Sequence, residues 1–366
     1  MDWSPAAILP NLTAQKAVEG GVVAFVPHDD PRVQEFCVAY PNFEELISRF
    51  TNAFGVPLKP VIQIVRNDVL SKLSYVEPLA SFRDLVALSV VPYARSLSVV
   101  YGNPHHISYS NSFWLYPWML AKDNKNIVAS TPALMGFHLV KEFHGQSSPE
   151  LSAMTLKDLD EPLFEALLVR WKHHYLGKRQ RWHDRALFRS LNMAAQAPQL
   201  PGGVDTTLYD LGRIAALWVS AFEILTHPRK GKAGLGSVYA CMNAISHIDG
   251  KVKQRRYSAY INHKKPWPRR TLACYLYGKL YRARCNFLHG EPIGTRPLNP
   301  AGSQVSLFWL APCLYRLALT AFLGVSHKGT IPKGHNPKKL GEYIASQLRF
   351  ERYQETIERA LLRARK

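Results

Sequence analysis

The spacing of apolar residues predicts helices through most of the second half of the chain. From residue 272 to residue 287, apolar side chains recur every three or four positions, which is the spacing of one helix face. These residues are Leu272, Leu276, Leu280, Ala283 and Phe287. Gly290 and Pro292 follow, and both residue types commonly end helices. A helix over 272–288 is therefore expected.

Similar patterns predict further helices over 160–175, 205–226, 306–323 and 337–366. In the last of these, the expected packing face consists of Leu340, Ile344, Leu348, Ile357, Leu361 and Leu362. These segments have no strand pattern between them, so the second half of the chain is expected to be all α.

The first half of the chain mixes strand and helix patterns. Short runs rich in β-branched residues at 20–27 and 61–65 predict strands. The segments 42–54 and 81–94 have the apolar spacing of helices, and Asn42 is the expected cap of the first. This mixture indicates a small α/β domain.

Charge divides the chain near a boundary that composition also marks. Residues 145–149 are small and polar, which is typical of a domain boundary. Residues 1–150 have a net charge of −2 and the remainder +21, which gives the +19 of the whole chain. We therefore predict a mainly α protein with a mixed α/β accessory or sensing domain at 1–148 and a basic helical domain at 149–366. A strongly basic domain is expected to meet a polyanion, although solubility or a membrane surface would have the same signature.

The densest charge lies in the basic segment, residues 251–284, which has eleven Lys and Arg residues and no acidic one. Three pairs of cations alternate with aromatic residues there, a pattern that favours nucleic-acid binding. The residues predicted to bind RNA are Arg255, Arg256, Lys264, Lys265, Arg269, Arg270 and Arg282.

Arg284 and His289 form the only Arg-x4-His pair in the chain, at the end of the helix predicted over 272–288. An arginine is permanently charged and offers a fork of donors to phosphate oxygens. A histidine can give or take a proton near neutral pH. The run LYRARCNFLHGEP (280–292) resembles the Arg-x4-His signature of the HEPN superfamily, many of whose members are RNA-cleaving toxins or defence nucleases. WVSAFEILTHP (218–228), which contains Glu223 within an apolar helix, resembles another helix of the same family.

The resemblance implies a HEPN-type helical bundle and a metal-independent endoribonuclease that acts as a homodimer. A ribose 2′-hydroxyl would attack the adjacent phosphate. Arg284 would stabilise the developing charge, and His289 would act as general acid or base. Asn286 would hold a phosphate oxygen or the histidine, and Glu223 would orient Arg284 or His289. By analogy the role would be that of a toxin or antiphage defence effector, controlled by an antitoxin or a phage-derived trigger.

Two other interpretations stay open. Cys285 follows Arg284, where many catalytic HEPN proteins have Asn, Asp or His, so the chain is also compatible with an inactive HEPN protein that binds RNA or a partner protein. Alternatively, Cys285 and His289 are four residues apart and are compatible with cysteine or metal chemistry.

The remaining composition predicts a cytoplasmic protein without cofactor or metal. Five scattered cysteines with no Cys-x-x-Cys pair indicate a reducing compartment. The N-terminus lacks a signal-peptide pattern, and no uninterrupted apolar run reaches the ~18 residues that would suggest a membrane span. His105 and His106 have no third ligand at metal-binding spacing, and no nucleotide-cofactor motif occurs.

Overall fold

The computed structural model divides into two compact units. It describes residues 1–52, 54–73, 76–102, 110–116, 118–120, 126–129, 137–139, 147–148, 154–156, 158–198, 208–261, 265–291, 298–299, 303, 305–327 and 337–364. The first unit comprises Met1–Arg83 and Ser110–Lys157, and the second comprises Asp84–Tyr109 and Asp158–Lys366. These units differ from the predicted division at 148/149, because Asp84–Tyr109 are grouped with the helical unit and Ser110–Lys157 with the first unit.

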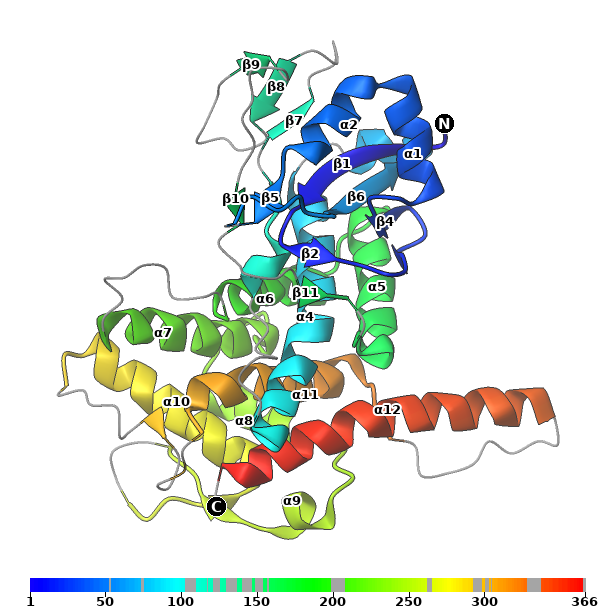
Figure 1. Ribbon diagram of the computed structural model, residues 1–366. Coiled ribbons are helices and arrows are strands. Elements are labelled where there is room, and N and C mark those ends of the chain that lie inside the picture. The colour runs from blue at the N-terminus through cyan, green and yellow to red at the C-terminus, as the bar shows by residue number, and fades with distance from the viewer. Residues whose placement is uncertain are drawn as a thin grey trace. The chain divides into compact units, whose positions relative to one another are not determined.

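The first unit is built on a small antiparallel sheet with the strand order β1-β6-β4-β3 (Figure 1). The strands are β1 (Trp3–Leu9), β3 (Val18–Glu19), β4 (Val23–Pro27) and β6 (Val61–Arg66). Helices α1 (Pro31–Ala39) and α2 (Pro41–Ser48) share a hydrophobic core with this sheet. Strand β4 lies within the predicted segment 20–27, and β6 covers the predicted segment 61–65 and one further residue.

Shorter elements complete the first unit. They are β2 (Leu12–Thr13), β5 (Thr51–Asn52), η1 (Asn67–Val69), α3 (Leu70–Leu73), η3 (Ser110–Phe113), β7 (Trp118–Leu120), β8 (Asn126–Ala129), β9 (Phe137–Leu139), β10 (Ser147–Ser148) and β11 (Met154–Thr155). Strands β7, β8 and β9 form a separate three-stranded sheet.

The helix expected over 42–54 has different ends in the structure. It begins at Pro41, with Tyr40 and not Asn42 at the cap position, because a proline is well suited to the first helical turn. It ends at Ser48. The side chain of Asn52 accepts the backbone N–H groups of Phe54 and Val56 at 2.9 and 3.0 Å, which stabilises a turn in place of further helix.

In the residues that the structure describes, the second unit is helical apart from one short hairpin. Its helices are the later part of α4 (Val76–Tyr101), then α5 (Glu161–Tyr175), α6 (Trp182–Gln196), α7 (Leu208–Leu225), α8 (Leu235–Asn243), α9 (Gly250–Gln254), α10 (Leu272–Leu288), α11 (Leu307–Leu323) and α12 (Pro337–Arg363). The hairpin joins β12 (Tyr257–Ser258) to β13 (Arg269–Arg270). The chain is thus mainly helical, with a small antiparallel sheet in its first unit.

Helix α11 lies at the centre of the second unit, and the residues from Leu310 to Thr320 are all buried. Its one buried arginine, Arg316, donates to Asp160 at 2.8 Å and also to Gln354. A buried charge needs such partners. These bonds tie α11 to the start of α5 and to α12.

Helix α10 has the ends and the packing face that its sequence predicts. Leu272, Leu276 and Leu280 are fully buried. Gly290 has a φ of 69°, and the N–H of Glu291 bonds to the carbonyl of Asn286 at 3.0 Å. A left-handed glycine with this bond is the usual Schellman end of a helix.

The end of α10 is packed tightly against α7. A Cβ added at Gly212 of α7 would lie 2.7 Å from the ring of Phe287. Because real Cβ atoms do not approach ring carbons so closely, only glycine allows this contact. The packing fixes α7 beside the last turns of α10.

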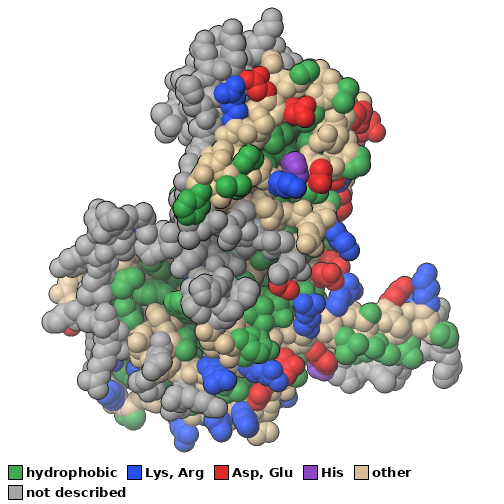
Figure 2. All heavy atoms as spheres, viewed as in Figure 1, with side chains coloured by type: hydrophobic (Ala, Val, Ile, Leu, Met, Phe, Trp, Pro, Cys, Tyr) green, Lys and Arg blue, Asp and Glu red, His purple; other side chains and the backbone are tan. Residues whose placement is uncertain are grey.

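The packing face predicted for the last helix is wrong over its first half. Ile344 and Leu348 are 47% and 60% exposed, and Leu340 is only half-buried. Ile357 and Leu361 are fully buried, as expected. Figure 1 shows that the first part of α12 extends beyond the other helices of its unit, and Figure 2 shows hydrophobic side chains along this stretch. No described helix has the length and apolar character needed to cross a membrane.

Candidate functional site

Arg284 lies on α10 beside Glu223 of α7. Its side chain is half-buried, and its Nε is buried without a hydrogen-bond partner among the described residues. Burial raises the pKa of the Glu223 carboxyl, and the positive charge of Arg284 opposes that rise. The two charges therefore interact through space, as the sequence suggested, although no hydrogen bond or ion pair between them occurs in the described part of the chain.

Tyr277 completes what we call the polar cluster, formed by Glu223, Tyr277 and Arg284. Tyr277 is seven residues before Arg284, which is two helical turns and hence the same side of α10. Its hydroxyl is buried and has no hydrogen-bond partner among the described residues. Burial raises its pKa well above the ordinary value, and the charge of Glu223 adds to the rise. The sequence reasoning missed Tyr277, although its spacing from Arg284 is a readable signal.

His289 is the residue that caps the C-terminus of α10, and it is exposed. Its backbone N–H bonds to the carbonyl of Cys285 at 3.0 Å. Five positions along a helix correspond to a rotation of about 140°, so Arg284 and His289 leave α10 in different directions. Within the described residues, neither a hydrogen bond nor an ion pair joins them.

Asn286 and Cys285 lie between them and are half-buried. The carbonyl of Asn286 accepts the N–H of Glu291, so its backbone helps to end the helix. The role predicted for its side chain stays a prediction. A search of the described residues finds no group of three His, Cys, Asp or Glu side chains arranged to hold a metal ion.

The β12–β13 hairpin of the basic segment lies along α10 and is attached to it by aromatic contacts. Tyr257 faces Arg270 across the hairpin. The ring centre of Tyr257 is 5.6 Å from that of Tyr275, and the ring centre of Tyr260 is 6.2 Å from that of Tyr281. These contacts fix the cationic hairpin against the helix that contains Arg284.

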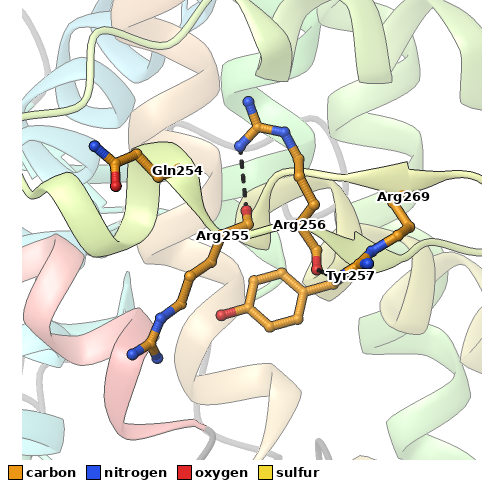
Figure 3. A pocket seen from close by; sticks show the side chains of 5 residues that line it. All are labelled: Gln254, Arg255, Arg256, Tyr257 and Arg269. Carbon is orange, nitrogen blue, oxygen red and sulfur yellow. Dashed lines mark hydrogen bonds between the residues drawn. The ribbon is translucent and has the colours of Figure 1, made fainter.

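A hollow of about 680 Å³ opens on this hairpin (Figure 3). Its lining consists of Gln254, Arg255, Arg256, Tyr257 and Arg269. The side chains of Arg255 and Arg256 point in opposite directions. Arg256 donates to the carbonyl of Arg255 at 3.2 Å, and Arg269 donates to the carbonyl of Arg256, also at 3.2 Å. Backbone carbonyls thus orient two of the three arginines, and none of the lining residues that the structure describes is acidic.

A second group of cations surrounds Trp267. The ammonium of Lys265 and the guanidinium of Arg282 lie 5.4 and 5.8 Å from the ring centre of Trp267. Burial lowers the pKa of Lys279, and the charges of Arg282 and Lys265 lower it further. Positive charge is therefore concentrated among the described residues here, and Lys279 is a member of the group that sequence reasoning did not single out.

The structure separates the predicted RNA-binding residues into these two groups. Arg255, Arg256 and Arg269 line the hollow, and Lys265 and Arg282 are at Trp267. Arg270 is directed to the ring of Tyr239, 4.8 Å away. Lys264 lies outside the described residues. Figure 2 shows Lys and Arg side chains gathered at the lower edge of the helical unit.

Comparison with known proteins gives no relative to set beside this geometry. Protein-family models, curated proteins and solved structures contain no match to the chain. The resemblance to the HEPN superfamily therefore rests on the residues of the Arg284 and Glu223 helices.

Proposed function

We propose that the chain is a HEPN-type, metal-independent endoribonuclease whose catalytic residues are Arg284 and His289. One observation carries the proposal. The helix that ends in an exposed histidine also holds a half-buried arginine one turn earlier, and cations lie along the same helix. RNA supplies the phosphates that such a surface would attract.

Each group has a separate task in the proposed reaction. The ribose 2′-hydroxyl attacks the adjacent phosphorus, its proton passes to a base, and the leaving 5′-oxygen takes a proton from an acid. His289 is the acid or base, an effect of typically 10²–10⁴-fold. The guanidinium of Arg284 stabilises the charge that develops on the phosphate oxygens. Glu223 positions Arg284, and Asn286 holds a phosphate oxygen or His289.

The active unit is a homodimer in this proposal. Arg284 and His289 diverge within one chain, so a second copy would supply the complementary residue and a second histidine for the acid and base roles. Leu288, next to His289, is 54% exposed. An exposed leucine beside a catalytic residue is compatible with a contact between copies. Light scattering that gives a monomer with full activity would contradict this part.

The direct test is incubation of total RNA with the purified chain in the presence of EDTA. RNA should be cleaved, and Arg284→Ala and His289→Ala should each reduce cleavage by about 10²-fold or more. Arg213→Ala and His183→Ala are matched controls, because both residues are exposed and outside the polar cluster and the basic segment. Cleavage that survives both catalytic substitutions would contradict the assignment.

A second candidate is a catalytically inactive HEPN protein that binds RNA or a partner. The observation in its favour is that the hollow and the Trp267 group do not include Arg284 or His289. Such a protein would bind RNA in a salt-sensitive manner and leave it intact. The same incubation separates the two candidates.

The biological role that we propose follows from the family resemblance. The chain would act in the cytoplasm as a toxin or antiphage defence effector. Its first unit would respond to an antitoxin or to a phage-derived trigger. The chain is expressed in cells with and without a candidate antitoxin or phage-derived trigger. Growth of the cells and integrity of their RNA are the measurements that test this role.

A further inference from the structure

A second hollow, of about 530 Å³, opens where the C-terminal ends of α4 and α12 meet the start of the basic hairpin. It is lined by Val100, Tyr101, Lys251, Arg255, Tyr257, Arg359, Leu362 and Arg363. Arg255 and Tyr257 also line the first hollow. In Figure 3 the side chain of Arg255 points away from that of Arg256, and Arg256 is not among the residues that line the second hollow.

Among the described residues, the cations that line this hollow outnumber their acidic partners. Four cations line it, and the one acidic partner of these among the described residues is Glu355, which bonds to Arg359 at 2.8 Å. The C-termini of α4 and α12 each contribute an effective helix-dipole charge of about −0.5. A surplus of about two positive charges is left by this count. Asp249 does not line the hollow, and its carboxylate accepts two backbone N–H groups of α9.

The lining of the same hollow also includes apolar and aromatic side chains. Val100 and Leu362 are half-buried, and Tyr101 is 67% exposed. The described residues provide no ring that stacks on Tyr101. An exposed tyrosine beside a cationic cluster offers a flat surface on which a base can stack.

We propose that this hollow binds a phosphorylated nucleotide, with the phosphate held by Arg359, Arg363 and Lys251 and the base against Tyr101. A phosphate of charge close to −2 matches the surplus of the lining, and arginine forks bind phosphate oxygens in pairs. Inorganic phosphate alone would make no use of the contacts that Val100, Tyr101 and Leu362 offer. The nucleotide is either free in solution or the 5′-phosphorylated end of an RNA strand.

This site is separate from the proposed catalytic residues. Arg359, Arg363 and Tyr101 belong to neither the polar cluster nor the Trp267 group. Binding can be measured with AMP, which has no internucleotide bond to cleave. The failure of RNA cleavage and the failure of nucleotide binding are therefore distinguishable results.

The test is calorimetric titration of the full chain with AMP, with inorganic phosphate, and with an RNA pentamer that has or lacks a 5′-phosphate. Arg359→Gln/Arg363→Gln should weaken AMP binding by about tenfold or more. Tyr101→Ala should weaken AMP binding by about fivefold or more and leave phosphate binding unchanged. Lys338→Gln/Lys339→Gln is the matched control, because it makes the same charge change at the other end of α12.

The pentamer identifies the source of the nucleotide. Tighter binding of the 5′-phosphorylated pentamer than of AMP would assign the site to RNA ends, and the reverse order would assign it to free nucleotide. The proposal is overturned if AMP does not bind saturably, if phosphate binds as tightly as AMP, or if the double arginine variant, shown by circular dichroism to be folded, binds AMP like the unaltered chain.

Discussion

Arg284 and Arg255 belong to the same basic segment but lie in opposite settings. Arg284 is half-buried, with Glu223 close enough to oppose its charge. Arg255 is exposed and shares its two hollows with other arginines. A buried arginine is restricted to one orientation and suits a specific task, whereas exposed arginines act through their summed charge. Substitution of Arg284 should therefore affect RNA cleavage, and substitution of Arg255 should affect RNA binding.

The largest effect is expected at Arg284. Replacement by alanine should reduce RNA cleavage by about 10²–10³-fold, because a preorganised donor to the transition state is removed. RNA affinity should change little, because one charge among many contributes little to binding. Single-turnover cleavage together with filter binding separates these quantities. If Arg284→Ala reduces RNA affinity and RNA cleavage in equal proportion, Arg284 acts through its charge like Arg255, and the contrast between the two arginines is wrong. Arg284→Lys keeps the charge without the planar fork and should also cleave poorly.

Gly212 allows α7 to pack closely against the end of α10. Gly212→Ala should lower the free energy of unfolding by about 1–3 kcal/mol, because the new Cβ would overlap the ring of Phe287. Chemical denaturation measures the change. Gly236→Ala on α8 is the matched control, since a Cβ there meets nothing within 4 Å. Equal stability of the two variants would show that α7 and α10 are not packed as described.

The exposed arginines should affect the salt dependence of RNA binding. Neutralising Arg255, Arg256 and Arg269 together should reduce the slope of log affinity against log salt. The expected reduction is about 0.7 for each phosphate of single-stranded RNA that these arginines neutralise in the unaltered chain. Binding measured at several salt concentrations gives this slope. If the slope equals that of the unaltered chain, these arginines do not neutralise RNA phosphates and contribute to solubility alone.

The smallest effect is expected from Glu223→Gln. Burial raises the pKa of this carboxyl, so the folded state is destabilised when the carboxylate is ionised. That penalty is complete above the raised pKa and disappears as the pH falls below the ordinary glutamate value. The variant should therefore have a higher Tm than the unaltered chain at neutral pH and an equal Tm in acid. A Tm gain that persists in acid would contradict the assigned cause.

Features of the fold that depend on neighbouring residues in the chain could be predicted from the sequence. Helix α10 has its expected limits because Thr271 caps one end and Gly290 ends the other. Helix α5 begins after Asp160, whose carboxylate accepts the N–H of Leu163. Caps, glycines and apolar spacing act within a few residues, so the sequence alone contains the information.

Features that depend on distant segments could not be predicted in the same way. The apolar spacing identified Ile344 and Leu348 as one face of α12, but spacing does not tell whether other parts of the chain cover that face. Tyr277 and Lys279 were missed because their settings arise from packing against Glu223 and the hairpin. The sequence predicted that Glu223 lies near Arg284 or His289, since a carboxylate inside an apolar helix needs a compensating partner; the structure places it near Arg284.

The most direct test of the central claim is analysis of the ends of the cleaved RNA. A short RNA and its all-2′-deoxy counterpart are incubated with the chain in EDTA, and the products are identified by mass spectrometry. Attack by the 2′-hydroxyl predicts fragments with 2′,3′-cyclic phosphate and 5′-hydroxyl ends, with the deoxy strand left intact. Cleavage of the deoxy strand, or fragments with 5′-phosphate ends, would contradict the mechanism assigned to Arg284 and His289.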